Sequence, residues 1–443
     1  MMNAEVRIMN TLIEEIPPKA KIANSDIDQS HETSQQLETR VDENKLHDLI
    51  ATDARVGIQN YGRLPVAFVK GEGARLWDSA GKEYLDFLGG IAVVTLGHSH
   101  PKITAAIARQ ASTLLHTSNI FYIEPQVKLA EKLSELSHGM RAFFCNSGAE
   151  ANEAAIKIAR KFHYNKGDTE RFEIITALDS FHGRTYGGLA ATGQPKYHEG
   201  FGPMPEGFYY VPLNDIDALS SVINGKTAAV MLEPIQGESG IRPASDEYLQ
   251  AARELCDAHG VLLILDEVQC GTGRTGKFFA HEWSGVRPDI IPMAKGLGNG
   301  VPIGALLATD EVASAFVPGT HGCTFGGNFL SCAAAVATIE ILFEENLLHN
   351  ALTQGEYFSR RLREWGETHD LISEVRGRGL MISAELKQPI ARELMKNSLE
   401  GGLVFNAVGD NILRFLPPLC ISHDDVDEAM DKLHAAHNSI AGE

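Results

Sequence analysis

The chain has 443 residues, of which 44% are hydrophobic and 22% are charged, a composition typical of a folded protein with two or three domains. Its 39 lysines and arginines stand against 58 aspartates and glutamates, so the formal net charge is −19. This excess of negative charge repels phosphate backbones and anionic lipid headgroups, which argues against nucleic acids and membranes as partners. A small anionic substrate would therefore need arginines placed locally.

The cysteines and the apolar segments indicate a cytoplasmic protein. The six cysteines are scattered without a C-x-x-C spacing, and we interpret them as reduced thiols. The longest apolar helical stretch begins at Phe329, contains polar residues and is too short to cross a bilayer. An export signal begins with a charged segment followed by an apolar one, and the N-terminus does not have this pattern.

The first hundred residues predict a tail followed by a small sheet. Residues 24–45 are almost wholly polar, and we expect a flexible tail over residues 1–45. Residues 46–100 are expected to join a smaller domain, because VAFV, a GEG turn and RLWDSAGKEYLDF predict an antiparallel meander with a hairpin at DSAGKE.

Residues 101–344 alternate between predicted helices and strands, which indicates the large domain. The alternation predicts an α/β fold with a mostly parallel sheet covered on both faces, and ligands outside the carboxyl ends of its strands. The main helices are expected at SGAEANEAAIKIARKFHY and DEYLQAARELCDAHG. The strands are expected at RAFFC, EIITAL, FYYVPL, AAVMLE, VLLIL, DIIPMA and IGALLA.

Residues 345–443 change to a mixed pattern and predict the smaller α+β domain. A helix is expected near residues 357–367, followed by strands at GLMISAEL and NILRFLPPL. A last helix is expected to begin near Asp424.

Two residues indicate the chemistry. Asp266 follows the apolar run VLLIL, and Lys295 lies in the glycine-rich stretch AKGLGNGVPIGA. A lysine amine can form a Schiff base with an aldehyde, and a carboxylate at the edge of a sheet can keep a pyridine nitrogen protonated. Each residue alone is more often structural, as a solvated loop lysine or a turn cap. Together they predict pyridoxal 5'-phosphate (PLP).

The segment CNSGAEANEAAIKIAR predicts a phosphate site at a helix start. Ser147 and Glu150 have the spacing of a capping box. The free N–H groups of such a helix start favour an anion, and Gly148 would let a phosphate approach. The alternative is an ordinary capped helix.

Other motifs support rival interpretations less well. Residues 271–277, GTGRTGK, match a P-loop, but Phe278 stands where a magnesium-binding Ser or Thr is needed and no amphipathic helix follows. A P-loop ATPase and a non-catalytic binding protein with this fold are the alternative classes. No metal site is expected, because two pairs of possible ligands lie in turns without further ligands: His98 with His100, and His321 with Cys323.

The stretch LDEVQCGTGRTGKFFAHE followed by AKGLGNGVPIGA resembles the signature of the class III PLP-dependent aminotransferases, a fold-type-I family. Five further blocks resemble that family in the expected order: CNSGAEANEAAIKIAR, SFHGRT, LEPIQGESG, CTFGGN and LRFLPPL. The resemblance extends from about Tyr61 to Pro418. It implies a seven-stranded type of sheet, a smaller domain and a homodimer whose active sites are shared between subunits.

The resemblance also implies roles for the cofactor-binding residues. Lys295 would form the Schiff base and carry the proton between substrate and cofactor, and Asp266 would hold the pyridinium proton. Gln269 would bind the phenolic oxygen, and Phe181 would stack on the ring, although core packing explains Phe181 equally well. The phosphate would be bound by Ser147, Gly148, Ala149 and, from the neighbouring subunit, Thr324.

Substrate binding is assigned by the same resemblance. Arg160 would bind the donor's α-carboxylate, and Glu238 would shield Arg414 until 2-oxoglutarate enters. Tyr61 fits both the ornithine and some acetylornithine relatives. The SGAEANE block, GIAVVTLGHSHP and Ile91 favour the acetylornithine branch, which moves the δ-amino group of N2-acetyl-L-ornithine to 2-oxoglutarate in arginine biosynthesis. Succinylornithine, ornithine and an ω-amino substrate of lysine biosynthesis remain alternatives.

Overall fold

A seven-stranded sheet forms the centre of the large domain, in the order β4-β12-β11-β10-β7-β5-β6. Neighbouring strands from β6 to β11 run parallel, as predicted, whereas β12 is antiparallel to both β11 and β4. The strands are β4 (Arg141–Cys145), β5 (Glu173–Ala177), β6 (Phe208–Val211), β7 (Thr227–Leu232), β10 (Leu262–Leu265), β11 (Ile290–Met293) and β12 (Gly304–Ala308). This computed structural model describes residues 43–442.

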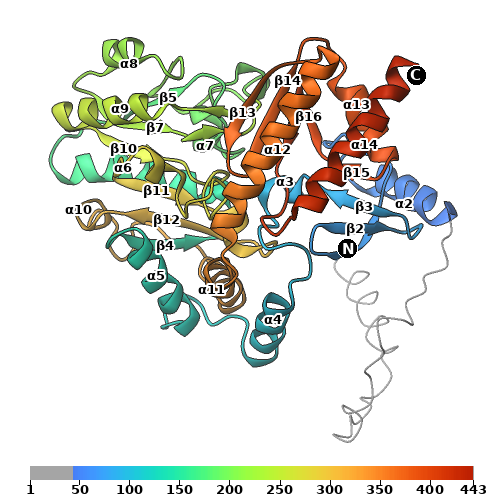
Figure 1. Cartoon of the computed structure of the whole chain (residues 1–443). Coiled ribbons are helices and arrows are strands. Elements are labelled where there is room, and N and C mark those ends of the chain that lie inside the picture. Colours follow the sequence, from blue (N-terminus) through green and yellow to red (C-terminus); the bar gives the residue numbers. More distant parts are fainter. Residues whose placement is uncertain (1–42, 443) are drawn as a thin grey trace, which may run out of the picture. The chain divides into compact units, whose positions relative to one another are not determined.

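Helices cover both faces of this sheet (Figure 1). Along β10, Ile264 packs against the face that carries α6 (Gly148–Asn165), whereas Leu263 and Leu265 pack against the face that carries α9 (Asp246–His259). Because alternate side chains of a strand point to opposite faces, a sheet covered on both sides needs an unbroken apolar run such as LLIL. The other helices of the region are α4 (Pro101–Thr113), α5 (Glu124–Leu136), α7 (Tyr186–Ala191), α8 (Ile216–Val222), α10 (Asp310–Ala313) and α11 (Phe329–Glu344).

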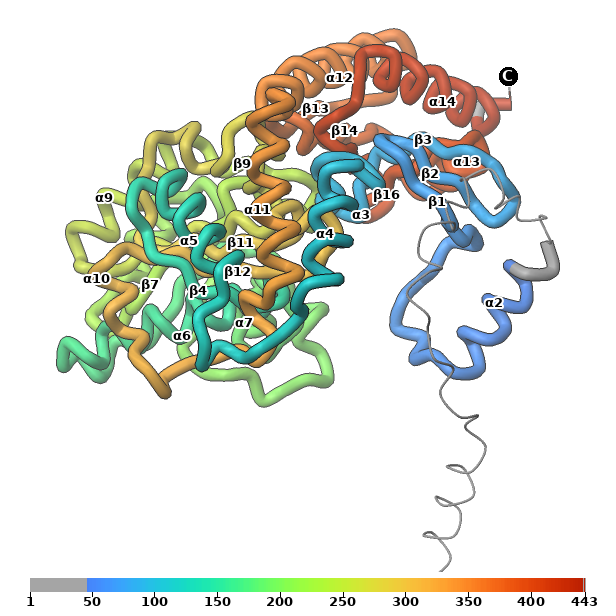
Figure 2. Tube along the Cα trace, turned by 90° about the horizontal axis from the view of Figure 1, so that it is seen from below, coloured from blue at the N-terminus to red at the C-terminus, as the bar shows by residue number. Residues whose placement is uncertain are grey.

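Two four-stranded sheets lie apart from the large one, and β8 (Ile235–Gln236) pairs with β9 (Arg242–Pro243) in a two-stranded one. The first has the order β1-β2-β3-β15, and β15 (Leu403–Val404) runs parallel to β3 (Glu83–Asp86), so an early segment pairs with a late one (Figure 2). The second has the order β13-β14-β17-β16 and is entirely antiparallel. The remaining strands of these sheets are β1 (Phe68–Glu72), β2 (Arg75–Asp78), β13 (Ile372–Arg378), β14 (Met381–Leu386), β16 (Asn406–Val408) and β17 (Ile412–Phe415).

The C-terminal helices differ from the prediction. The helix expected near residues 357–367 is α12 (Leu347–His369), and α13 (Ala391–Glu400) was not predicted. Gly355 lies inside α12, where a Cβ atom would collide with the backbone of Gly379. A glycine that is needed for close packing weakens the helical signal of the sequence, and this explains the missed first turns. The last helix, α14 (His423–Ala441), begins where it was expected.

The chain divides into two compact units, Met1–Asn60 and Tyr61–Glu443. In the first unit the structure describes one helix, α2 (Glu43–Val56), which was not predicted. The rest of the predicted flexible tail lies outside the described residues. Across residues 43–442, no helix has both the length and the hydropathy that a membrane span requires.

Candidate active site

A cavity of about 410 Å³ opens where β4, β10 and β11 end and α6 begins. Seven of the eight predicted cofactor residues line it: Ser147, Gly148, Ala149, Phe181, Asp266, Gln269 and Lys295. Other residues of the lining are Glu238, which was predicted to take part in substrate binding, and Asn152, His182, Arg184, Glu233 and Val268. The carboxyl edge of the sheet therefore brings together segments that are far apart in the sequence, as the strand order requires.

Asp266 follows β10 directly and is 3% exposed. Its Oδ2 accepts hydrogen bonds from Asn152 Nδ2 and from His182 Nδ1, each at 2.8 Å, and its Oδ1 accepts one from the N–H of Val268 at 2.9 Å. Burial lowers the pKa of His182, but the hydrogen bond and the charge of Asp266 outweigh it and raise the pKa overall. The surroundings fix both the position and the orientation of this carboxylate.

Lys295 follows β11 in a left-handed backbone conformation, with φ of 45°. Its side chain is half-buried at the cavity wall, and burial lowers the pKa of Lys295, although the carboxylates of Glu238 and Asp266 act in the opposite direction. Removing an ammonium group from water favours the neutral amine, which is the nucleophilic form. A strained backbone at a half-buried, reactive side chain is typical of a functional site.

The start of α6 borders the cavity as the sequence predicted. The Ser147 hydroxyl accepts a hydrogen bond from the N–H of Glu150 at 3.2 Å, and Glu150 accepts one from the N–H of Asn146 at 2.5 Å. A Cβ atom at Gly148 would lie 2.6 Å from a methyl group of Val268. The glycine therefore lets the helix start pack against the loop that follows β10, in addition to leaving the N–H groups open.

An ion pair borders the cavity: Glu238 lines it, whereas its partner Arg414 is not one of the lining residues. Arg414 on β17 is 2% exposed and its Nη1 is 2.9 Å from Glu238 Oε1. Arg414 also donates to the carbonyl of Gly237 and to Asn406 Oδ1, and Gln269 Nε2 donates to Glu238 at 3.0 Å. Burial acts to raise the pKa of Glu238, but the charges of Arg414 and Lys295 lower it overall. The carboxylate and the guanidinium therefore neutralise each other inside the protein.

Glu233 is a second buried carboxyl group at the site, which sequence reasoning missed. It follows β7, the strand next to β10, and accepts a hydrogen bond from the N–H of Phe181 at 3.1 Å. Burial, together with the charge of Asp266, raises the pKa of Glu233 to about 8, although His182 acts in the opposite direction. Its place at the end of the strand AAVMLE was the available signal, since neighbouring parallel strands end at the same edge.

Arg160 does not line the cavity, contrary to the role predicted for it. Its Nε donates to the carbonyl of Phe172 and its Nη2 to the carbonyl of Glu206, and its guanidinium lies over the ring of Phe208. Arg160 is near the far end of α6, about 18 Å from the helix start at a rise of about 1.5 Å per residue. Arg184 lines the cavity instead, in the SFHGRT block three residues after Phe181.

Two other predicted residues lie outside this cavity of the same chain. Tyr61 is 68% exposed, and Thr324 is exposed in the loop before α11. The role of Thr324 in a neighbouring subunit stays a prediction.

The P-loop interpretation is wrong. Arg274, in the middle of residues 271–277, is buried and donates hydrogen bonds to the carbonyls of Leu380 and Pro417. Burial lowers the pKa of Arg274 to about 9. The segment is followed by a 3-10 turn (Ala280–Trp283) instead of a long helix. It therefore joins the loop after β10 to the smaller domain and forms no phosphate cradle. Residues 43–442 also contain no group of three potential metal ligands in suitable positions.

The fold and this site define an aminotransferase-type enzyme, and the comparisons identify the family. The family described as Aminotransferase class-III matches residues 57–437. The acetylornithine aminotransferase of Methanocaldococcus jannaschii is 52% identical over 391 residues, which cover 88% of this chain and 98% of that protein. The chain belongs to the class III aminotransferases, which are PLP-dependent transaminases.

Solved structures agree with this assignment. A Toxoplasma gondii ornithine aminotransferase, described with partial occupancy of PLP at its active site, superposes with a TM-score of 0.85 at 35% identity, covering 89% of this chain and 95% of that one. The N-acetylornithine aminotransferase of Stenotrophomonas maltophilia superposes with a TM-score of 0.77 at 39% identity, covering 89% and 100%.

The cavity fits PLP on its own evidence. Within the described chain, three buried polar atoms at the site have no hydrogen-bond partner: Gln269 Oε1, His182 Nε2 and Asn152 Oδ1. Unsatisfied buried groups are rare unless a ligand or water completes them. A half-buried amine, a buried carboxylate and the start of a helix are also the groups that an aldehyde, a pyridine nitrogen and a phosphate would need.

Proposed function

We propose that this enzyme moves the δ-amino group of N2-acetyl-L-ornithine to 2-oxoglutarate, giving N-acetylglutamate 5-semialdehyde and L-glutamate in arginine biosynthesis. The observation that carries the proposal is the ion pair between Arg414 and Glu238 at 2.9 Å. An aminotransferase must accept two different substrates in turn at one site. A guanidinium masked by a carboxylate is neutral toward the first substrate, and can bind a carboxylate of the second when the pair separates.

The residues would divide the chemistry as follows. When bound, PLP supplies an electron sink beside the amine-bearing carbon of the substrate. The Lys295 amine would attach the cofactor and then move the proton at that carbon, since it is the amine that lines the cavity. Asp266 would hold the ring nitrogen's proton, Gln269 would donate to the phenolic oxygen, and Phe181 would lie against the ring. Ser147, Gly148 and Ala149 would bind the phosphate.

Arg184 takes the place that the sequence assigned to Arg160. Its guanidinium lies 4.0 Å from the ring centroid of Tyr197 and 5.5 Å from that of Phe181. Within residues 43–442, no carboxylate forms an ion pair with Arg184, so its guanidinium remains available to a substrate carboxylate. We assign it to the α-carboxylate of the donor.

The test of the substrate is a panel of amino donors with 2-oxoglutarate. N2-acetylornithine, N2-succinylornithine and ornithine are compared by kcat/KM for glutamate formation. We expect N2-acetylornithine to exceed ornithine by at least about tenfold, equivalent to about 1.4 kcal/mol in the transition state. A higher kcat/KM for ornithine or for the succinyl compound would replace the acetyl assignment.

A homodimer is the second part of the proposal. Large apolar side chains are exposed in one segment: Leu114, Leu115, Ile120, Phe121 and Tyr122. Asn119 in this segment donates to the carbonyls of Cys323 and Gly326, so the segment adjoins the loop that carries Thr324. Exposed apolar patches usually mark an interface, and a second copy of the chain is the occupant that we propose. The free cysteines of the described residues agree with the proposed cytoplasmic location.

Thr324 tests the shared site. Thr324→Ala is expected to weaken PLP retention by the dimer, because a hydrogen bond to a charged group contributes about 1.5 to 3 kcal/mol. Thr324→Ser keeps the hydroxyl and is expected to retain the cofactor. An unchanged PLP dissociation constant in Thr324→Ala, or a fully active monomer in light scattering, would reject the shared site.

A further inference from the structure

A second cavity, of about 570 Å³, lies at the opposite edge of the large sheet. The catalytic cavity lies where β11 ends, whereas Pro288 and Ile291 line the second one where β11 begins. A four-residue strand spans about 13 Å, so the two cavities are separate. Met140 before β4, Thr309 after β12 and the segment that follows Lys277 complete the wall.

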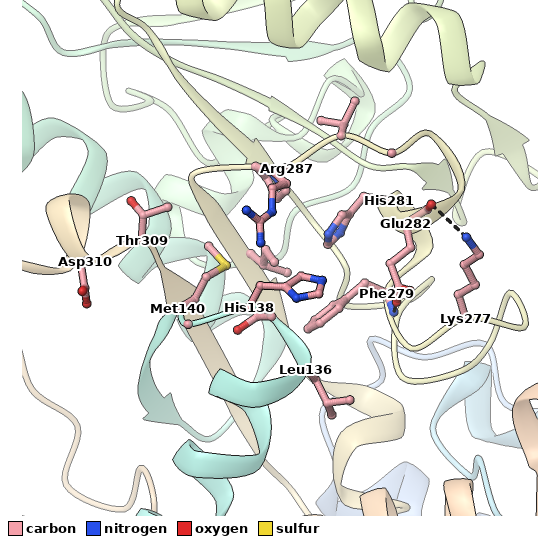
Figure 3. A pocket seen from close by; sticks show the side chains of 16 residues that line it. Leu136, His138, Met140, Lys277, Phe279, His281, Glu282, Arg287, Thr309 and Asp310 are labelled. Atoms are coloured by element: carbon pink, nitrogen blue, oxygen red, sulfur yellow. Dashed lines mark hydrogen bonds between the residues drawn. The ribbon is translucent and has the colours of Figure 1, made fainter.

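Nitrogen-bearing side chains point into this cavity from three segments. Figure 3 shows the guanidinium of Arg287 and the rings of His138 and His281 turned toward its middle, with Lys277 at one side. Within residues 43–442, neither the Arg287 guanidinium nor the His138 ring has a hydrogen bond or an ion pair. The cavity therefore offers several unused donors that converge on one space.

His281 is held in a fixed orientation at the back of the cavity. The residue is 8% exposed, and its Nδ1 lies 2.9 Å from Oε1 of the fully buried Glu267. Glu267 also accepts hydrogen bonds from the N–H groups of Ala280 and His281, each at 2.8 Å. Because the contact at Nδ1 fixes the orientation of the ring, a ligand that binds Nε2 does not have to order this side chain further.

The acidic residues of the lining are partly used by neighbours. Oε1 of Glu282 accepts the N–H of Phe279 at 2.8 Å, and Asp310 pairs with Arg141 at 2.5 Å. Figure 3 shows Asp310 at the margin, on the opposite side of the cavity from Lys277. The guanidinium of Arg287 is exposed and, within residues 43–442, forms no ion pair with either of these carboxylates. A negatively charged group is the natural partner for it.

The remaining wall is apolar, and this defines the ligand class. Leu136, Met140, Phe279, Val286 and Ile291 form it. We propose that this cavity is a second ligand site, which binds a small organic anion that has a carboxylate next to a short apolar chain. The carboxylate would meet the fork of Arg287 together with the rings of His138 and His281, and the chain would lie against Phe279 and Met140.

The test measures binding of hexanoate to the full-length, PLP-loaded enzyme by calorimetry, with hexanamide as the uncharged counterpart. We expect hexanoate to bind at least about tenfold more tightly than hexanamide, because the amide lacks the charge that Arg287 recognises. Equal binding of the two probes, or no binding of hexanoate at millimolar concentration, would overturn the proposal.

Variants distinguish this cavity from the catalytic one. Arg287→Gln is expected to weaken hexanoate binding at least about tenfold, and Arg287→Lys to restore part of it. Arg392→Gln, which removes the same charge from an exposed site on α13, is expected to leave binding unchanged. Arg414→Gln alters the catalytic cavity, and hexanoate binding is also expected to be unchanged in this variant. If Arg414→Gln abolishes the binding while Arg287→Gln retains it, hexanoate occupies the catalytic cavity and the second site is rejected.

Discussion

Asp266 and His182 are joined by a hydrogen bond of 2.8 Å between two fully enclosed side chains, and they are 84 residues apart in the sequence. The histidine holds one side of the carboxylate that faces the catalytic cavity, and Asn152 holds the same oxygen. The position of the acid that would hold the ring proton thus depends on His182 and Asn152, which hold its carboxylate in place.

His182→Gln is expected to reduce kcat by about 10- to 100-fold, because a hydrogen bond to a charged group contributes about 1.5 to 3 kcal/mol. The absorption of the bound cofactor should shift as well, since the ring nitrogen loses its fixed partner. The matched control is His163→Gln, which alters another buried histidine that contacts the carbonyl of Ala228. If both variants lose activity equally, His182 acts only through stability.

Lys295→Ala is expected to abolish covalent attachment of the cofactor and multiple turnover. Reduction with borohydride followed by peptide mass spectrometry should find the cofactor mass on Lys295 in the wild type and on no lysine in the variant. Lys161→Ala, at a half-buried position of α6 outside the cavity, should keep both attachment and activity. Full transamination by Lys295→Ala would reject the assignment of the reactive amine.

Arg184 and Arg160 should behave differently, since Arg184 lines the cavity and Arg160 does not. Arg184→Ala is expected to raise the KM for the amino donor by about 10-fold or more, because a charge-assisted bidentate contact is lost. Arg160→Ala is expected to change KM little and to lower the melting temperature, because it removes contacts to Phe172 and Glu206. If steady-state kinetics show a raised KM in Arg160→Ala and not in Arg184→Ala, the donor's α-carboxylate would be assigned to Arg160.

Arg414→Ala separates the two half-reactions in single-turnover spectra. Because Glu238 masks Arg414, the donor half-reaction should stay near the wild-type rate. The half-reaction with 2-oxoglutarate should slow by about 10²-fold, for about 3 kcal/mol of lost charge-assisted bonding. Equal slowing of both halves would mean that Arg414 has a structural role.

Glu233 predicts a pH dependence of stability in the cofactor-free protein. Its folded-state pKa is raised to about 8 from an ordinary value of 4.5, so between these values the folded chain keeps a proton that the unfolded chain releases. The free energy of unfolding should therefore fall as pH rises from about 4.5 to 8. Glu233→Gln should remove part of this fall, whereas Glu173→Gln should not. If melting temperature depended on pH in the same way in wild type and in Glu233→Gln, the role of Glu233 would be contradicted.

Several parts of the molecule were determined by the sequence itself. The run VLLIL predicted a strand buried on both faces, because only a covered sheet accepts an unbroken apolar segment. The carboxylate directly after it had to lie at the sheet's ligand-binding edge. The sequence also predicted the helix start at Ser147, because capping depends on residues within four positions of each other. Local physics was sufficient for these features.

The tertiary structure alone decided which distant residues meet. Arg160 and Arg184 are both compatible with a cavity when only their sequence positions are known, and the length of α6 carries Arg160 away from it. Asn152 and Asp266 meet across 114 residues of chain, and Arg414 and Glu238 across 176. Such pairs depend on strand order and on the packing of one domain against another. No local pattern encodes them, because hydrogen bonds and ion pairs form between neighbours in space, and the fold determines which residues become neighbours.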